Sequence, residues 1–247
     1  MISAAIVVYK HSKFFIAKLI ESLVNNGVNK VYILDNSNKK TASIKKEYYE
    51  YYSLGKNIGF GRGHNLLQKK ASEHKIHFVV NPDIILENNN VLKSLSEILI
   101  NNKNSVIVAP KILYFNGDLQ ESIRKYPSLF SLFLRKFYYD LYLKLNYNYN
   151  MSSINKTTSV DAVSGAFFGI THNNFQRING FDERYFMYME DLDFCREAVK
   201  YGRVLYVPHI SVLHGYEKGS SKSLKLFIIH INSVIKYFIK WKLLKKF

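Results

Sequence analysis

The order of strand-like and helix-like segments constrains the fold of this chain more than any other feature of its sequence. Short apolar runs rich in β-branched residues stop abruptly at polar residues, as buried parallel strands do, at residues 4–9, 31–34, 77–80, 106–109 and 204–207. Segments with helical spacing or polar helical composition alternate with them, at residues 15–23, 41–51, 65–73, 91–100 and 191–201. This alternation predicts an α/β fold in which a mostly parallel, Rossmann-like central sheet is flanked by helices.

Length, charge and cysteine content limit the class of protein further. At 247 residues the chain has the size of one domain or of two tightly fused halves. Its net charge of +16 favours an anionic partner, which could be nucleic acid, a phosphate-bearing ligand or an anionic membrane surface. The single cysteine, Cys195, excludes a disulfide framework and a multi-cysteine zinc site.

The C-terminal tail, residues 216–247, is predicted to form a basic amphipathic helix. From residue 222 onward it has no acidic residue, and its lysines are Lys222, Lys225, Lys236, Lys240, Lys242, Lys245 and Lys246. Apolar residues recur there at helical spacing, namely Leu224, Phe227, Ile231, Ile235, Phe238 and Trp241. Such a helix is typical of a membrane-surface element, while the alternative is a helix that packs its apolar side on the domain.

The sequence predicts neither a transmembrane helix nor a signal peptide. No apolar run approaches the ~20 residues that cross a bilayer, and Lys10, His11 and Lys13 interrupt the apolar start of the chain. We therefore expect a cytoplasmic protein that associates peripherally with the inner face of the cell membrane.

Polar clusters follow three of the predicted strands. They are Tyr9-Lys10-His11, Asp35-Asn36-Ser37 and Asn81-Pro82-Asp83. Each cluster alone is typical of an ordinary turn. Because ligands of open α/β sheets bind beyond the carboxyl ends of the strands, the three together predict one ligand cleft.

A glycine-rich segment, residues 57–65, precedes a predicted helix. Its glycines would let backbone N–H groups approach a phosphate, and Arg62 would add positive charge. The glycine spacing differs from the dinucleotide fingerprint, and the segment lacks the Gly-Lys-Ser/Thr ending of a P-loop.

Three carboxylates occur within Glu190-Asp191-Leu192-Asp193, directly after the aromatic run at residues 185–189. Acidic residues at a helix start also stabilise the helix, which would account for one or two of them. A carboxylate beside an aromatic surface can instead act as a general base. His214 is a core or surface histidine in the simplest interpretation, and together with Asp83 it could bind a divalent metal.

In this order, the motifs resemble those of the family 2 glycosyltransferases with the GT-A fold, and most closely the bacterial rhamnosyltransferases that build O-antigen and related polysaccharides. The resemblance runs from residue 2 to about residue 240 and includes a tail with Ser220, Ser221, His230, Ser233 and Tyr237. Its other elements are Asp35-Asn36-Ser37, residues 57–65, Asn81-Pro82-Asp83, Ser164-Gly165-Ala166, Gly180-Phe181-Asp182-Glu183, residues 185–188, Glu190-Asp191-Leu192-Asp193 and His214.

The resemblance implies a role for each of these residues. Asp191 would be the catalytic base, and Asp83 with His214 would bind Mg²⁺ or Mn²⁺. Acceptor binding would involve Gly165, Glu190 and His230. Donor binding would involve Tyr9, Asp35, Asn36, Asn57, Gly59, Phe60, Arg62, Asn65 and Asn81.

The same resemblance implies a GT-A domain at residues 1–215, with a nucleotide-sugar-binding half at 1–110 and an acceptor and catalytic half at 111–215. The reaction would invert the anomeric configuration, with dTDP-rhamnose or a UDP-sugar as donor and a polyprenyl-diphosphate-linked saccharide as acceptor. Residues 115–160 would determine acceptor specificity, and within them residues 127–149 form either a helix or an aromatic lid.

Three other functions fit parts of the sequence. One is transfer of galactofuranose or an N-acetylhexosamine from a uridine nucleotide. Another is a basic nucleic-acid-binding protein with stacking aromatic residues, which we do not expect because the charge concentrates in the tail and the aromatics lie in apolar runs. The last is a membrane scaffold without activity, which Asp83, Asp191 and His214 argue against.

Overall fold

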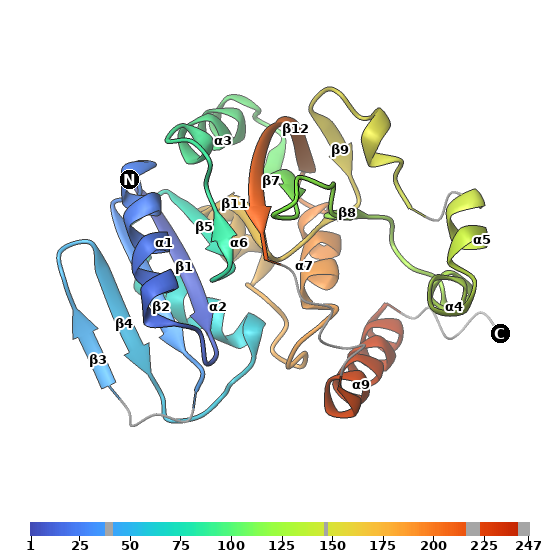
Figure 1. The fold of residues 1–247 in the computed structure, drawn as a ribbon, viewed down its shortest axis with the longest axis horizontal. Coiled ribbons are helices and arrows are strands. Elements are labelled where there is room, and N and C mark those ends of the chain that lie inside the picture. The colour runs from blue at the N-terminus through green and yellow to red at the C-terminus, as the bar shows by residue number, and fades with distance from the viewer. Residues whose placement is uncertain (38–41, 146–147, 216–222, 242–247) are drawn as a thin grey trace.

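The computed structural model describes residues 1–37, 42–145, 148–215 and 223–241 (Figure 1). In this part of the chain, ten strands form one mixed sheet in the order β3-β4-β2-β1-β5-β11-β7-β12-β6, with β9 paired to β12. These strands are β1 (Ile2–Val8), β2 (Lys30–Asp35), β3 (Ala42–Lys45), β4 (Tyr49–Ser53), β5 (Ile76–Val80), β6 (Ile84–Ile85), β7 (Ser105–Leu113), β9 (Thr158–Val160), β11 (Phe167–Thr171) and β12 (Arg203–His214). β8 (Ile123–Arg124) and β10 (Ala162–Val163) pair separately.

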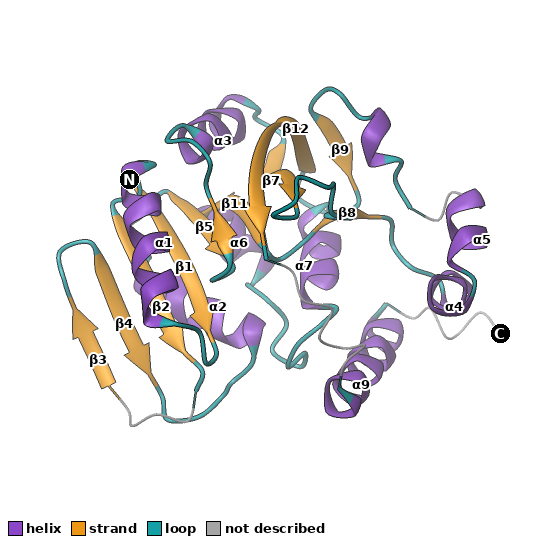
Figure 2. Cartoon of the chain, in the orientation of Figure 1, coloured by secondary structure: helices purple, strands orange, loops and turns teal. Residues whose placement is uncertain are grey.

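Helices cover both faces of this sheet (Figure 2). They are α1 (Lys13–Asn25), α2 (Phe60–Lys70), α3 (Val91–Asn101), α4 (Leu129–Phe137), α5 (Tyr139–Lys144), α6 (His172–Ile178), α7 (Glu190–Ala198) and α9 (Leu224–Lys240), with a 3-10 turn at Met151–Ser153. Leucines of α1 and α3 share one buried core, and residues of α6, α7 and α9 share another. The α/β class, the flanked sheet and the C-terminal helix are thus as predicted.

The register of the parallel strands brings the predicted polar clusters to one edge of the sheet. Val8 of β1 lies opposite Asp35 of β2, and Ile6 lies opposite Val80 of β5. The backbone N–H of Asn36 also donates to the carbonyl of Val8, at 2.8 Å. The residues that follow these strands therefore emerge side by side.

The predicted helix at residues 41–51 is wrong. Tyrosine-rich β4 pairs in parallel with β2 and antiparallel with β3. Tyrosine and isoleucine suit a pleated, half-buried surface, and the pairing of Tyr49–Ser53 with β2 overrides the helical composition.

Two predicted boundaries also differ. Strand β12 continues past Pro208 to His214, because Pro208 lies where the pairing with β7 shifts between Val207 and Ser211 and no ladder hydrogen bond is required of it. Helix α2 begins at Phe60, inside the glycine-rich segment. Within residues 127–149, which were expected to be a helix or a lid, α4 and α5 form two short helices.

No helix in the described part of the chain combines the length and the apolar character that crossing a membrane requires.

Candidate active site

Asp35 and Asn36 organise the start of the candidate donor cleft. The buried Asp35 carboxylate accepts hydrogen bonds from the Ser37 amide at 2.8 Å, from the Ser37 hydroxyl and from the Tyr51 hydroxyl at 2.7 Å. Asn36 donates from Nδ2 to the Gly59 carbonyl at 3.0 Å and accepts from the Ile58 amide at 3.3 Å. The strand end thus fixes the glycine-rich segment beside it.

Gly59 joins the glycine-rich segment to the aromatic run before Glu190. Its φ is +89°, and a Cβ added there would lie 2.4 Å from the Phe186 carbonyl oxygen, so only glycine fits. The next amide, of Phe60, donates to the same carbonyl at 3.0 Å. Asn57 supports the turn by accepting from the Gly59 amide at 2.9 Å. This contact brings residues 57–60 and 185–189 together.

Arg62 and Asn65 contact the loop that carries Phe181 and Glu183. The Asn65 amide group accepts from the Phe181 amide at 2.8 Å and donates to the Phe181 carbonyl at 2.8 Å. Arg62 donates from Nε to the Glu183 carboxylate at 3.0 Å. These contacts give both side chains a part in positioning this loop, and their place in donor binding remains a prediction.

Asp83 and His214 face each other at the end of β5 and β12. His214 Nε2 lies 3.2 Å from Asp83 Oδ1 and 3.2 Å from Asn81 Nδ2. Burial raises the pKa of the Asp83 carboxyl, but the hydrogen bond and charge of His214 outweigh it and lower the net pKa. A carboxylate oxygen and an imidazole nitrogen therefore converge here, beside the end of β1 with its exposed Tyr9.

Gln120 fixes the orientation of His214. Its Nε2 donates to the His214 carbonyl at 2.8 Å, and its Oε1 lies 3.0 Å from His214 Nδ1. In this arrangement Gln120 Oε1 accepts from His214 Nδ1–H, and Nε2 faces Asp83. A partner behind the imidazole is the usual support for a metal-binding histidine.

The Asp83 carboxylate and the His214 imidazole are suitable ligands for a divalent cation that a bound diphosphate would also coordinate. No group of three or more His, Cys, Asp or Glu side chains converges anywhere in the described residues. The Asp83 and His214 pair alone supplies two positions of an octahedral ion, so diphosphate oxygens and water would complete its coordination.

Asp191 lies at the start of α7, as expected for the candidate base. Its Oδ2 accepts from the Arg124 guanidinium at 2.7 Å and from the Gly165 amide at 3.1 Å. Its Oδ1 accepts from the Leu192 amide at 2.8 Å. These donors fix the orientation of the carboxylate at the start of the helix.

The Gly165-Ala166 dipeptide connects the two candidate centres. The Gly165 amide donates to Asp191, and the Ala166 carbonyl accepts from the Asn81 amide at 2.8 Å. A Cβ at Gly165 would lie 3.2 Å from the Asp191 Cβ, so glycine allows Asp191 to approach. Asn81 Nδ2 in turn lies 3.2 Å from His214 Nε2, so hydrogen bonds through the Gly165-Ala166 backbone and the Asn81 side chain join the candidate base to the candidate metal pair.

Glu190 is buried beside Asp191. Burial, followed by the charge of Asp191, raises the pKa of the Glu190 carboxyl to about 8. Its Oε2 has no hydrogen-bond partner among the described residues. Glu190 is therefore protonated at neutral pH in the folded protein.

This proton predicts a pH dependence of stability. Between pH 4.5, the ordinary pKa, and about 8, the folded protein binds a proton that the unfolded chain releases, so the free energy of unfolding falls as pH rises through this range. Glu190→Gln removes this loss, so we expect its stability relative to the parent to rise by roughly 5 kcal/mol between about pH 4 and pH 9, the linkage value of a pKa raised from 4.5 to about 8. Urea unfolding at several pH values measures this, with the exposed Glu87→Gln as control. An unchanged slope in Glu190→Gln would contradict it.

Helix α9 supports the strained turn before Glu190. Tyr188 and Met189 both have positive φ, of 69° and 66°. The Ser233 hydroxyl donates to the Met187 carbonyl at 2.8 Å, and the His230 ring packs on Tyr188 with centroids 4.9 Å apart. His230 thus contacts the site through Tyr188, and its role in acceptor binding remains a prediction.

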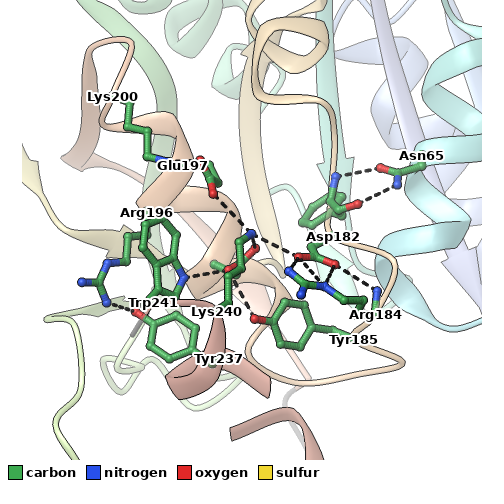
Figure 3. Close-up of polar contacts among 12 residues, drawn as sticks. Asn65, Asp182, Arg184, Tyr185, Arg196, Glu197, Lys200, Tyr237, Lys240 and Trp241 are labelled. Atoms are coloured by element: carbon green, nitrogen blue, oxygen red, sulfur yellow. Dashed lines mark hydrogen bonds and ion pairs between the residues drawn. The ribbon is translucent and has the colours of Figure 1, made fainter. Parts of the chain in front are cut away.

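A cluster of charged and aromatic side chains attaches α9 to α7 (Figure 3). Lys240 Nζ lies 2.7 Å from Asp193 Oδ2, 3.1 Å from Asp182 and 3.3 Å from Glu197. The Trp241 indole donates to Asp193 at 2.8 Å, and the Arg196 guanidinium lies 4.4 Å from the Trp241 ring centroid. The end of α9 is therefore part of the domain core.

Lys240→Ala is expected to lower the free energy of unfolding by about 3 kcal/mol, because it leaves the Asp193 carboxylate, 1% exposed, without its cation. Urea unfolding followed by the fluorescence of the single tryptophan, Trp241, measures this effect. Lys225→Ala, at an exposed position of the same helix, is the matched control. Equal stability of the two variants would contradict the prediction.

Two residues of the site were not predicted from the sequence. Arg124 lies 67 positions before its partner Asp191, and Gln120 lies 94 positions before His214. The only sequence signal for Arg124 is a weak one, its place just before a proline-containing aromatic stretch. No sequence signal points to Gln120. Lys222, Lys242, Lys245 and Lys246, and with them Ser220 and Ser221, lie outside the described residues.

The sequence matches no family model. It is 28% identical over 264 residues to the rhamnosyltransferase WbbL of Escherichia coli K12, covering 99% of this chain and 95% of that protein. The chain is rhamnosyltransferase-like. A segment of 53 residues is 45% identical to the N-acetylglucosaminyl-diphospho-decaprenol L-rhamnosyltransferase of Mycobacterium tuberculosis, covering 21% of this chain and 17% of that protein.

Solved structures establish the fold. The crystal structure of GalNAc-T7 with UDP, GalNAc and Mn²⁺ aligns with a TM-score of 0.65 at 14% identity, over 87% of this chain. Staphylococcus aureus TarS aligns with a TM-score of 0.57 at 16% identity, also over 87%. The chain spans only 43% and 36% of the lengths of these two proteins. They show that the chain has the GT-A fold, and the names of the sequence relatives support a glycosyltransferase.

Proposed function

We propose that the protein is an inverting glycosyltransferase that transfers L-rhamnose from dTDP-rhamnose to a lipid-linked saccharide during synthesis of a bacterial surface polysaccharide such as O-antigen or capsule. The observation that carries the proposal is the connection of Asp191 to Asp83 and His214 through Gly165-Ala166 and Asn81. It joins a candidate base to a candidate diphosphate site. The whole-chain similarity to a rhamnosyltransferase supports the donor.

In this proposal Asp191 removes the proton of the acceptor hydroxyl. The hydroxyl oxygen attacks the anomeric carbon opposite the leaving nucleotide, forms the new glycosidic bond and inverts the configuration. Arg124 and the Gly165 amide orient the carboxylate before the acceptor arrives. Asp83 and His214 would hold Mg²⁺ or Mn²⁺, which when bound neutralises charge on the departing diphosphate.

The acceptor proposal rests on a relative and on helix α9. The mycobacterial relative carries decaprenol-diphosphate-linked N-acetylglucosamine in its name. A polyprenyl-diphosphate-linked saccharide lies in a membrane, and α9, which has lysines and no acidic residue, contacts the turn before Glu190. We therefore place the protein on the anionic inner face of the cell membrane.

Donor binding tests the proposal directly. Calorimetry with dTDP-, UDP- and GDP-sugars, with and without Mn²⁺, is expected to show selective binding of dTDP-rhamnose that strengthens with metal. Selective binding of a UDP-sugar would keep the glycosyltransferase and replace the donor by galactofuranose or an N-acetylhexosamine. Absence of any sugar-nucleotide binding by folded protein would reject the donor cleft.

A further inference from the structure

Helices α4 and α5 expose aromatic side chains that the chemistry of the site does not use. Phe130, Phe133 and Phe137 share one face of α4 and are 56, 49 and 61% exposed. Tyr138, Tyr139, Leu141 and Leu145 continue the exposed apolar surface onto α5. Exposed apolar patches of this extent mark interaction surfaces in soluble domains.

The two helices are firmly built and attached to the active site. Ser128 caps α4 through a reciprocal capping box with Ser131, while Leu134 and Tyr142 are buried on the opposite side. Arg135 pairs with Glu121 at 3.3 Å, and Glu121 follows Gln120, the support of His214. At the start of this segment lies β8, whose Arg124 contacts Asp191. The exposed aromatic face therefore has a fixed position relative to the site.

Helix α9 lies at the same end of the molecule (Figure 1) and has a second exposed apolar face. Its inner side packs through Tyr237 and Phe238 into the core against which Leu132 of α4 also packs. The outer side of α9 is a stripe at spacings of three and four residues, formed by Leu224, Ile228, Ile231, Ile235 and Ile239. The predicted apolar side of this helix is thus divided, with Phe238 packed inside and Ile231 and Ile235 outside.

The charge around both faces is positive. Residues 224–240 contain no acidic residue and three lysines, of which Lys240 is paired with carboxylates of the domain. The stretch from 125 to 145 contains one acidic residue, Asp140. The exposed Lys125, Lys144 and Lys225 lie in these stretches. Apolar and aromatic side chains accompanied by lysines are the combination that binds at the headgroup level of an anionic bilayer.

We propose that α4, α5 and α9 form one membrane-docking surface that inserts Phe130, Phe133 and Phe137 into an anionic phospholipid bilayer. The purpose assigned to it, presenting Asp191 to a lipid-linked acceptor, rests on the proposed function. A second copy of this chain is disfavoured as the occupant, because pairing would bring two basic faces of a protein with net charge +16 together.

Co-sedimentation of the full chain with phosphatidylethanolamine and phosphatidylglycerol vesicles, in a roughly three-to-one ratio, tests this surface. We expect the combined variant Phe130→Gln, Phe133→Gln and Phe137→Gln to partition about 10- to 100-fold more weakly than the parent. The matched control is Phe14→Gln with Phe15→Gln, which alters two phenylalanines on α1 that are 61 and 64% exposed. Glutamine is a good helix former, and circular dichroism verifies folding.

The remaining outcomes are decisive. A parent that does not bind the vesicles, or an α4 variant that binds as strongly as the parent, would overturn the proposal. So would a dimer, seen by sedimentation velocity, that only the α4 variant dissociates. If the α4 variant fails to fold, a combined variant of α9 replaces it, with Leu224→Gln, Ile228→Gln and Ile235→Gln. We expect this variant to lose vesicle binding to the same extent. Vesicle binding requires neither donor nor acceptor. The vesicle result can therefore be interpreted even if the proposed transfer activity is not found.

Discussion

Asp191→Asn is expected to lower the rate of sugar transfer by about 10²- to 10⁴-fold, the usual contribution of a positioned general base. The substitution preserves the shape of the side chain and the hydrogen bonds that its retained oxygen accepts. It removes the lone pair that would take the acceptor proton and the charge that pairs with Arg124. Transfer rates at saturating donor and acceptor, with donor affinity and thermal unfolding measured in parallel, separate chemistry from binding and folding.

Glu190→Gln is the informative companion to this variant. Both carboxyls lie at the start of α7, but burial raises the pKa of Glu190 to about 8 while Asp191 contacts Arg124 at 2.7 Å. A carboxyl that is protonated at pH 7 is a poor base, so Glu190→Gln should lose far less activity than Asp191→Asn. The reverse order would assign the base to Glu190, and full activity of Asp191→Asn would reject the mechanism.

Arg124 gives the base assignment a second test. Its guanidinium, 26% exposed, is the strongest donor to the Asp191 carboxylate. Arg124→Ala should therefore reduce the rate without weakening donor binding, because the carboxylate loses the contact that orients it. A reduction in donor affinity alone would place Arg124 in the donor cleft instead.

The parts of this fold that the sequence predicts are those with local causes. Strands β1, β2, β5 and β7 are predicted because their β-branched runs end at polar residues. Helices α1 and α3 are predicted because apolar residues recur on one face. Since β1, β2 and β5 run parallel, their polar ends must meet, which is why Asp35 and Asn81 could be placed at one edge.

The parts that the sequence does not predict depend on contacts between distant segments. The tyrosines of β4 satisfy a helical and an extended pattern equally well, and only pairing with β2 decides between them. Arg124 and Gln120 act on partners that the fold brings to them from 67 and 94 positions away. Lysine at position 240 looked like a membrane-facing charge, yet three carboxylates surround it. Such roles can be recognised only once the tertiary structure shows which residues meet.

Asp83→Asn is expected to lower the rate by about 10²- to 10³-fold and to abolish the stimulation by Mn²⁺. The variant keeps the size of the side chain but removes the only carboxylate that faces His214 Nε2 within hydrogen-bonding distance in the described residues. Activity assayed across a Mn²⁺ titration, and after EDTA treatment, measures both effects. Asp118→Asn, which alters an exposed aspartate in a nearby turn, is the control and should behave as the parent.

Gln120→Ala distinguishes a metal site from a simple hydrogen-bonded pair. Gln120 contacts the His214 carbonyl and Nδ1, so we expect it to act on the candidate metal pair through the orientation of the imidazole. Loss of such a support weakens metal affinity by about 10- to 100-fold. The Mn²⁺ titration of Gln120→Ala should therefore shift to higher concentration and reach nearly the parent rate at saturation. A lower maximal rate with an unshifted titration would mean that His214 acts on the substrate directly, with Asp83 as its hydrogen-bond partner.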